Sequence, residues 1–364
     1  MEILENALKG KVIHDFPYPI KTRKCPHASL VSLTNPGGCV YCCPMCYARA
    51  YPWSITDKII IYKNLVEKLS SEIEKLNIAF PFYLSQVTDP LQPIEKIKEL
   101  TFQIVRILIS KRLSFKIVTK SAKGVKELIE KNKELLKYPY WFLEMTVEAT
   151  PEKQIITSPN ASPIKERLEV IKYLTEKGIE VVGRTDPTIL GLIDWEDLAW
   201  LIDNLKNAGV KHIIASCGYY NKVSMENLLN RMKNSIFRER IKKVINFYQY
   251  HPNSKKKKFL APLKIRIDFH TKFKKLCEGN NLTYAVCQEL PKEYDSKNLV
   301  SCEGSKRNFV HIKINKEFIP INCYGDCLRS CPDLKNPPCN LPIFQKEYPY
   351  KGKRLFQKLY PSLI

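Results

Sequence analysis

Short apolar segments alternate with amphipathic stretches over the first two thirds of the chain. The apolar segments are rich in β-branched and aromatic residues and have the length of buried strands. Six of them stand out, at residues 28–33, 80–85, 115–119, 140–147, 179–184 and 211–216. Between them, Leu65, Leu69, Ile73 and Leu76 recur at helical spacing, and residues 94–108 carry a wider apolar face. This alternation predicts six β-α units.

Helix-start signals support the same alternation. Ser162 before Pro163 is typical of an N-cap followed by proline at the first helical position, and Asp194 with Asp197 marks another start. Repeated β-α units call for a parallel sheet with helices outside. We expect an α/β fold, a partial (β/α)6 barrel of the TIM type, with an open doubly wound sheet as the alternative.

The pattern divides the chain into three parts. Residues 1–28 are expected to be an irregular N-terminal lead-in, and residues 29–225 to form the partial barrel. Residues 226–364, where the alternation stops, are expected to form a basic, cysteine-rich C-terminal region. A chain of 364 residues is long enough for a large domain with such an extension.

Polar residues follow each predicted strand. In a parallel barrel these positions converge at the carboxyl ends of the strands, where the chemistry of such folds takes place. A loop with four cysteines follows the first strand, and the next five strand ends carry Thr88 and Asp89, then Lys120, Thr146, Arg184 and Cys217.

The loop at residues 35–49 concentrates the chemistry. Cys39, Cys42, Cys43 and Cys46 fall within eight positions. Cys39, Cys43 and Cys46 have C-x3-C-x2-C spacing, which suits a [4Fe-4S] cluster with one iron lacking a protein ligand. A zinc ion held by all four cysteines is the alternative, and a disulfide is disfavoured because the chain shows no sign of secretion.

The loop and four later segments resemble the radical S-adenosylmethionine (SAM) enzymes, specifically the spore photoproduct lyase branch. The resemblance covers Asn35-Pro36, the cysteine triad, Tyr47-Ala48-Arg49 and the run from Ser85 to Glu95. It continues through Thr119-Lys120-Ser121, Arg167-Leu168 and the passage from Gly183 to Asp194. Met45 stands where the family usually has an aromatic residue, Ser158 where it has glutamate, and Leu190 where it has a second proline.

The resemblance implies a cofactor and a reaction type. A [4Fe-4S] cluster on Cys39, Cys43 and Cys46 would bind SAM and cleave it reductively to a 5'-deoxyadenosyl radical, which abstracts hydrogen from the substrate. It also implies an enzyme of lyase or transferase type that receives electrons from a donor such as ferredoxin or flavodoxin. Lys120 is expected to meet the SAM carboxylate, with Thr88, Asp89, Thr146 and Arg184 as further cofactor contacts. Asp89 could instead cap a turn.

Two residues are candidates for the radical chemistry. Tyr47 directly follows the last ligand and could stack near the cluster or relay an electron. Photoproduct lyases carry a hydrogen-donating cysteine near the second strand end, whereas this chain has Ser85-Gln86-Val87-Thr88 there. Cys217 could take over as hydrogen donor, although a buried inert cysteine is the alternative.

Charge bears on the substrate. The formal net charge is +22, and residues 221–280 hold 16 Lys or Arg against 4 Asp or Glu. Such a field favours DNA or RNA, although lysine-rich composition can have other origins. The run 255–258, interleaved with aromatic residues, would suit a groove for single strands. The aromatic residues are Tyr248, Tyr250, Phe259, Phe269 and Phe273.

A second cysteine set lies near the C-terminus. Cys323, Cys327, Cys331 and Cys339 fall within 17 positions in a proline-rich segment. They predict an auxiliary [4Fe-4S] cluster or a structural zinc, and Cys287 or Cys302 could replace one of the four. Such a cluster would suit the alternative of a peptide or small-molecule substrate.

The compartment follows from what the chain lacks. It has no signal-peptide pattern and no apolar run of membrane-spanning length, so we expect a cytoplasmic protein without a membrane partner. A non-catalytic, metal-stapled nucleic-acid-binding protein is the remaining alternative to an enzyme.

Overall fold

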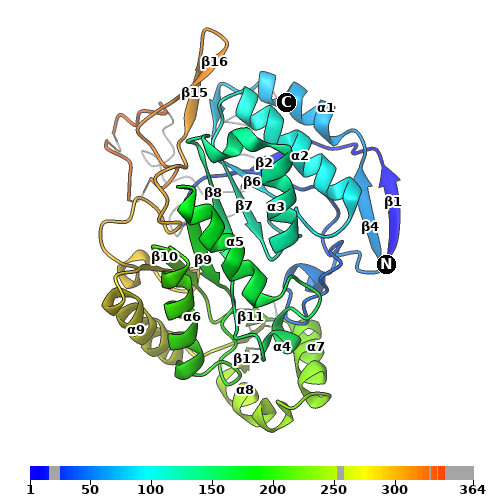
Figure 1. Cartoon of the computed structure of the whole chain (residues 1–364), viewed down its shortest axis with the longest axis vertical. Coiled ribbons are helices and arrows are strands. Elements are labelled where there is room, and N and C mark those ends of the chain that lie inside the picture. Colours follow the sequence, from blue (N-terminus) through cyan, green and yellow to red (C-terminus); the bar gives the residue numbers. More distant parts are fainter. Residues whose placement is uncertain (16–24, 252–257, 328, 334, 341–364) are drawn as a thin grey trace.

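A mixed α/β architecture forms around one long sheet in this computed structural model (Figure 1). The structure describes residues 1–15, 25–251, 258–327, 329–333 and 335–340. Part of the predicted basic run, residues 255–257, lies outside them. No helix in the described ranges has the length and apolar character to cross a membrane.

The six predicted strands are all present and lie side by side in chain order. They are β3 (Ser29–Val31), β6 (Phe82–Leu84), β7 (Phe115–Thr119), β8 (Trp141–Thr146), β9 (Val181–Thr185) and β10 (His212–Ala215). Each pairs in parallel with its neighbour. The prediction of a parallel-rich α/β sheet is therefore confirmed.

Two further strands extend this sheet at its edges. β14 (Thr283–Val286) pairs in parallel with β10, and β2 (Ile13–Asp15) pairs antiparallel with β3. The described sheet thus has eight strands, in the order β14-β10-β9-β8-β7-β6-β3-β2. A six-unit barrel is not confirmed, because the sheet has additional strands and two unpaired edges in this order.

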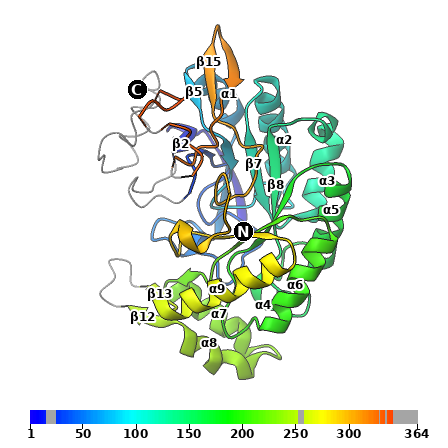
Figure 2. The same cartoon turned by 90° about the vertical axis from the view of Figure 1, so that its left-hand side faces the viewer.

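Helices cover the outer face of the sheet. Figure 2 shows α2, α3, α5 and α6 along the right-hand side of the strands. The connecting helices are α1 (Leu65–Glu74), α2 (Glu95–Ser110), α3 (Ala122–Lys131), α4 (Gln154–Thr157), α5 (Ile164–Glu176), α6 (Trp195–Asn207), α7 (Lys222–Lys233), α8 (Ile241–Phe247) and α9 (Leu263–Gly279). Short 3-10 turns span Ala48–Ala50, Lys133–Leu136, Arg238–Arg240 and Lys292–Tyr294. Apolar residues from the sheet and these helices form one continuous core.

The predicted helix starts are close to those observed. Asp194 caps α6 in a reciprocal capping box with Asp197, as predicted. For α5 the prediction is off by one residue, because Pro163 occupies the N-cap position. The Ser162 hydroxyl instead accepts a hydrogen bond from the backbone of Ala122, 2.9 Å away, and so ties α5 to α3.

Three small sheets complete the described fold. β1 (Glu2–Asn6) pairs with β4 (Lys58–Tyr62), so the expectation of an irregular lead-in is wrong for this segment. β11 (Tyr219–Tyr220), β13 (Lys258–Leu260) and β12 (Gln249–His251) form the second. β15 (His311–Ile314) and β16 (Glu317–Pro320) form a hairpin with β5 (Ile78–Ala79) at the opposite end of the molecule (Figures 1 and 2).

The domain boundaries stay predictions. The structure adds that residues beyond 225 contribute to the main sheet, since β14 extends it next to β10 and α9 packs against β14. The C-terminal region is thus interleaved with the α/β unit.

Candidate functional site

The cysteine loop follows β3, and its first half is held by side-chain hydrogen bonds. The Asn35 side chain donates to the Ile55 carbonyl at 2.9 Å and accepts from the Ile60 backbone at 2.7 Å. Gln92 accepts from the Val40 backbone at 2.9 Å and donates to the Gly38 carbonyl at 3.2 Å. Gly37 has φ +86°, and an added Cβ would lie 2.9 Å from the Ile55 carbonyl oxygen. The loop therefore has one well-determined path.

Three of the four loop cysteines influence one another electrostatically. Burial and neighbouring acidic groups raise the pKa of Cys39, with Asp89 and Cys43 contributing. Burial raises the pKa of Cys43 to about 12, with Cys46 adding to the shift and Lys120 opposing it. Cys42 has φ +46°, and its thiol donates to the Cys39 carbonyl at 3.4 Å. The geometry thus sets Cys42 apart from the predicted triad.

A cavity of about 750 Å³ opens beside the loop. It lies at the carboxyl ends of the parallel strands, where the fold class places its sites. Five of the predicted site residues line it, namely Cys43, Cys46, Tyr47, Lys120 and Arg184.

Lys120 lies between the cysteine triad and a buried carboxylate. Burial alone would lower the pKa of Lys120, but Glu148 and Cys43 outweigh it and raise the pKa, so the amino group stays charged. Within the part of the chain that the structure describes, Lys120 forms no ion pair. Its amino group is therefore available to an anion in the cavity.

Arg184 is engaged by neighbouring side chains. It donates to Glu144 at 2.6 Å, forms an ion pair with Asp186 and donates to the Cys287 thiol at 3.3 Å. Glu144 also pairs with Lys116 at 2.9 Å, and Lys116 pairs with Glu303. Burial alone would raise the pKa of Glu144, but Lys116 and Arg184 outweigh it and lower the pKa. The cavity wall is thus built from paired buried charges.

The remaining predicted cofactor contacts lie outside the cavity lining. Both Asp89 carboxylate oxygens accept hydrogen bonds, from Leu91 at 2.9 Å, from Thr119 at 2.8 and 2.9 Å and from the Lys120 backbone at 2.7 Å. This geometry favours the turn-capping alternative for Asp89. Thr88 lies within hydrogen-bond distance of the Thr34 hydroxyl at 3.3 Å, and Thr146 is buried. The cofactor roles of Thr88, Asp89 and Thr146 stay predictions.

The two candidates for radical chemistry differ in their access to the cavity. Tyr47 lines it, and its hydroxyl donates to the Gln86 carbonyl at 2.7 Å. Cys217 is fully buried behind the wall, with its thiol 3.7 Å from His270. A hydrogen-donating role for Cys217 would require a path through that wall.

Sequence reasoning missed a group of thiols inside the cavity. Cys25, Cys287 and Cys302 line it, although the first and last are far apart in sequence. Cys302 is hydrogen-bonded to Cys25, and this contact and burial raise the pKa of Cys302. The sequence held one signal, since Cys287 directly follows a short β-branched and aromatic segment.

The predicted basic and aromatic groove is largely wrong. Tyr248, Phe269 and Phe273 are buried in the core, while Tyr250 and Phe259 pack together with ring centroids 5.0 Å apart. Only Tyr250 of the five is substantially exposed. The aromatic residues of α9 recur at a spacing of four because they form its buried face.

Aromatic side chains gather instead at the cavity, and two of them, Tyr47 and Trp53, are exposed. Tyr51 stacks on Trp53 with centroids 4.9 Å apart, Tyr47 lies 5.8 Å from Tyr51, and Tyr219 lies 6.3 Å from Tyr47. Lys258 lies over the Tyr219 ring, 3.5 Å from its centroid. We name Tyr47, Tyr51, Trp53 and Tyr219 the aromatic ladder; all four line the cavity.

The C-terminal cysteines also form a group. Burial raises the pKa of Cys323 to about 12, and Cys339 and Cys331 add to the shift. Burial likewise raises the pKa of Cys327, with the other three thiols contributing. The four predicted ligands therefore lie together.

Both cysteine groups fit a metal cluster better than free thiols. Burial disfavours a lone thiolate, so several neighbouring thiolates require a cationic centre. Tetrahedral zinc would hold its sulfur ligands about 3.8 Å apart, given Zn–S bonds of about 2.3 Å. In an iron-sulfur cube, each thiolate binds a different iron.

The chain has relatives among known proteins. The chain is 23% identical over 278 residues to the radical SAM Nalpha-GlyT isomerase of Pseudomonas phage M6, covering 74% of this chain and 56% of the isomerase. The chain thus spans just over half the length of that relative. It is 32% identical over 183 residues to an uncharacterized protein of Methanocaldococcus jannaschii, covering 49% of this chain and 67% of that protein.

The fold has counterparts among solved structures. A variant of spore photoproduct lyase superposes with a TM-score of 0.56 at 13% identity, covering 78% of this chain and 81% of the lyase. No family model matches the chain.

Proposed function

The chain belongs to the radical SAM enzymes, and from that premise we propose that it cleaves SAM reductively and abstracts hydrogen from a nucleic-acid substrate. Its relatives imply a [4Fe-4S] cluster and SAM as cofactors. When bound, these supply one-electron cleavage of the sulfonium and a 5'-deoxyadenosyl radical. We assign the cluster to Cys39, Cys43 and Cys46, with a ferredoxin or flavodoxin as electron donor.

The available charge of Lys120 carries this proposal. Its amino group lines the cavity beside Cys43, lacks an ion pair with any described residue and keeps its proton because of Glu148 and Cys43. A carboxylate entering the cavity would gain a charge-assisted hydrogen bond there. Lys116 and Arg184, in contrast, are already paired with carboxylates. Lys120 is therefore our candidate for the methionine carboxylate of SAM.

The aromatic ladder supports a nucleic-acid substrate. It runs from Tyr47, next to the proposed ligand Cys46, out to Trp53, whose side chain is 67% exposed. Such rings stack on bases regardless of sequence, and each stacked base contributes about 1–3 kcal/mol. Lys258 over Tyr219 adds a cation where a phosphate would pass. The net charge of +22 favours the same partner.

We also propose an auxiliary [4Fe-4S] cluster on Cys323, Cys327, Cys331 and Cys339. The mutual influence of their thiols supports a shared metal centre. Cys287 and Cys302 are less suited to replace one of the four, because each has a neighbour in the main cavity, Arg184 and Cys25 respectively.

Deoxyadenosine release tests the enzyme and the triad together. The full chain is reconstituted anaerobically with iron and sulfide, reduced and incubated with SAM. Cys43→Ala should abolish 5'-deoxyadenosine formation, because one iron would lose its ligand. Cys42→Ala should leave 5'-deoxyadenosine formation unchanged, because the Cys42 thiol donates a hydrogen bond to the Cys39 carbonyl. The opposite result would mean that the triad is misassigned, and no release from either protein would remove the enzyme assignment.

Oligonucleotide binding tests the substrate class. Trp53→Ala should weaken single-stranded DNA binding by about 1–3 kcal/mol, roughly 5- to 150-fold, through lost stacking. Trp195→Ala is the matched control, because Trp195 is exposed at the start of α6, outside the residues that line the cavity. Equal losses in both variants, or binding that is insensitive to salt, would instead favour the peptide or small-molecule alternative.

A further inference from the structure

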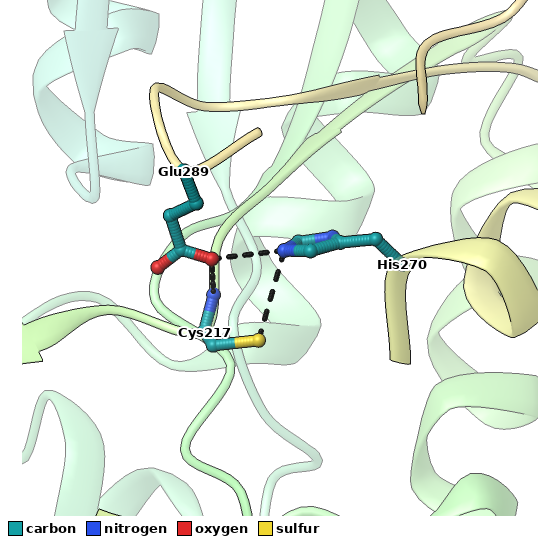
Figure 3. A group of neighbouring side chains, drawn as sticks. All are labelled: Cys217, His270 and Glu289. Atoms are coloured by element: carbon teal, nitrogen blue, oxygen red, sulfur yellow. Dashed lines mark hydrogen bonds and ion pairs between the residues drawn. The ribbon is translucent and has the colours of Figure 1, made fainter. Parts of the chain in front are cut away.

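A second group of ligating side chains lies at the cavity wall, apart from both cysteine sets: Glu289 lines the cavity, and Cys217 and His270 lie behind it. Figure 3 shows Cys217, His270 and Glu289 pointing toward one another from three different elements. Their donor atoms all lie within 4.8 Å of one another. Cys217 follows β10, His270 belongs to α9 and Glu289 follows β14. All three side chains are at least nine-tenths buried.

The arrangement differs from that of a nucleophilic triad. In such triads the thiol and the carboxylate bind opposite nitrogens of the imidazole, so that the carboxylate orients the ring while the other nitrogen takes the thiol proton. Here the Cys217 thiol, at 3.7 Å, and a Glu289 oxygen, at 2.8 Å, both face Nε2 of His270 (Figure 3). Nδ1 faces the Tyr284 hydroxyl at 2.6 Å. Three donors converging on one point is instead the geometry of a metal site.

The Tyr284 contact suits such a site. Histidine ligands almost always hold their second nitrogen in a hydrogen bond, which fixes the ring and its tautomer. Donation from Nδ1 to Tyr284 would leave the Nε2 lone pair free for a metal. The Nε2 lone pair would then face the Glu289 oxygen directly. A cation between the lone pair and the oxygen would relieve their electrostatic repulsion.

Glu289 supplies an independent observation. Its second carboxylate oxygen, Oε1, is buried and has no hydrogen-bond partner among the described residues. The side chain is only 6% exposed, so water cannot readily satisfy that oxygen. A carboxylate that binds a cation through both oxygens would use it. Three residues would then provide four donor atoms, one sulfur, one nitrogen and two oxygens.

We propose that Cys217, His270 and Glu289 bind a zinc ion. A mixed sulfur, nitrogen and oxygen set is typical of zinc and unlike the all-sulfur set of an iron-sulfur cluster. Tetrahedral zinc would hold Sγ and Nε2 about 3.6 Å apart, close to the 3.7 Å observed. The Glu289 oxygen would retreat from Nε2 by about half an ångström to make room. The two anionic ligands would neutralise the ion, which suits a buried position.

The ion would have a structural role independent of SAM chemistry. It would join the ends of β10 and β14 to α9 and so hold the last parallel strand against the sheet. The neighbouring contacts support this, because Arg266 of α9 donates to the Glu289 carbonyl at 2.8 Å. A zinc-bound thiolate carries no hydrogen atom, so this assignment competes with the predicted donor role of Cys217.

Metal analysis of the full chain tests the site. The chain is expressed with added zinc, purified anaerobically and reconstituted with iron so that the cysteine sets are filled. We expect one zinc per chain in the wild type and in Cys277→Ser, and a loss of at least tenfold in Cys217→Ser and His270→Gln with iron unchanged. Cys277 is the matched control, because it is fully buried two turns from His270 on the same helix.

X-ray absorption at the zinc edge provides a readout that needs no variant. The site predicts a single sulfur neighbour together with nitrogen and oxygen. A spectrum with several sulfurs would assign the zinc to a cysteine set and overturn the proposal. Absence of zinc from the wild type, or zinc retained in His270→Gln, would also overturn the proposal. If the variants fail to fold, the zinc content and the spectrum of the wild type decide.

Discussion

Arg167→Met should destabilise the protein strongly, because it leaves a buried carboxylate without its partner. Arg167 is 0% exposed and donates to Glu148 at 3.0 Å, to Ser158 at 2.9 Å and to the carbonyls of Ser162 and Thr146 at 2.7 and 3.0 Å. Removing one partner of a fully buried pair costs about 3–5 kcal/mol. For a chain of 364 residues that corresponds to a fall in Tm of roughly 4–7 °C.

Thermal unfolding of the anaerobic chain, followed by circular dichroism, measures this loss. Arg307→Met is the control, since Arg307 is 30% exposed and pairs with Glu180 at 3.6 Å, so its loss should be about 1 kcal/mol or less. Combining Arg167→Met with Glu148→Leu should recover part of the stability, because the carboxylate that loses its Arg167 partner is removed as well. If Arg167→Met is no less stable than Arg307→Met, the conclusion that Arg167 and Glu148 form a buried, charged pair is refuted.

The same pair predicts a pH dependence. Burial alone would raise the pKa of Glu148, but Arg167 and Lys120 outweigh it and lower the pKa below its ordinary value of 4.5. The stabilisation is therefore complete above pH 4.5 and is lost as pH falls through the folded-state pKa. The difference in Tm between wild type and Arg167→Met should shrink over that range, and a constant difference would contradict the linkage.

Three further outcomes are expected. Lys120→Ala should weaken SAM binding by about 1.5–3 kcal/mol without loss of iron, measured by calorimetry, while Lys123→Ala, exposed on α3, should not. Cys327→Ala should lower the iron content while leaving the absorbance of the first cluster, and unchanged iron would exclude the auxiliary cluster. Burial lowers the pKa of His212 to about 4, so the wild type should lose about 3 kcal/mol as pH falls from 6.5 to 4. His212→Gln should flatten that part of the stability profile, and an unchanged slope would assign it to other groups.

The strands and their ends could be predicted because their signals are local. Each of the six predicted segments is a short apolar run, and burial on both faces of a parallel sheet produces such runs. The cysteine loop could be predicted for the same reason, since its ligands fall within eight positions. β14 was missed because it has only four residues and follows α9. The many lysines of α9 mask the apolar face of that helix in the sequence.

Contacts between distant segments could not be predicted. Cys25 forms a hydrogen bond with Cys302, and Lys116 of β7 forms an ion pair with Glu303. Both contacts arise because segments far apart in the sequence line the same cavity. A weaker signal existed, since Lys116 and Glu144 are charged residues inside otherwise apolar strands. Such residues are buried only with partners. The sequence therefore indicated that partners exist but not which ones.

The cations along the cavity fall into two groups with different roles, according to whether they are paired with carboxylates. Lys116 and Arg184 are neutralised by Glu144, Glu303 and Asp186, so they shape the wall and attract a passing anion only weakly. Lys120 alone among these three cations lacks a carboxylate within ion-pair distance in the described residues, and it lies beside the cysteine triad. The exposed rings and Lys258 stand at the mouth. We therefore expect the carboxylate of the cofactor to bind at depth first, and a stacked polyanion to reach the cavity only along the aromatic ladder.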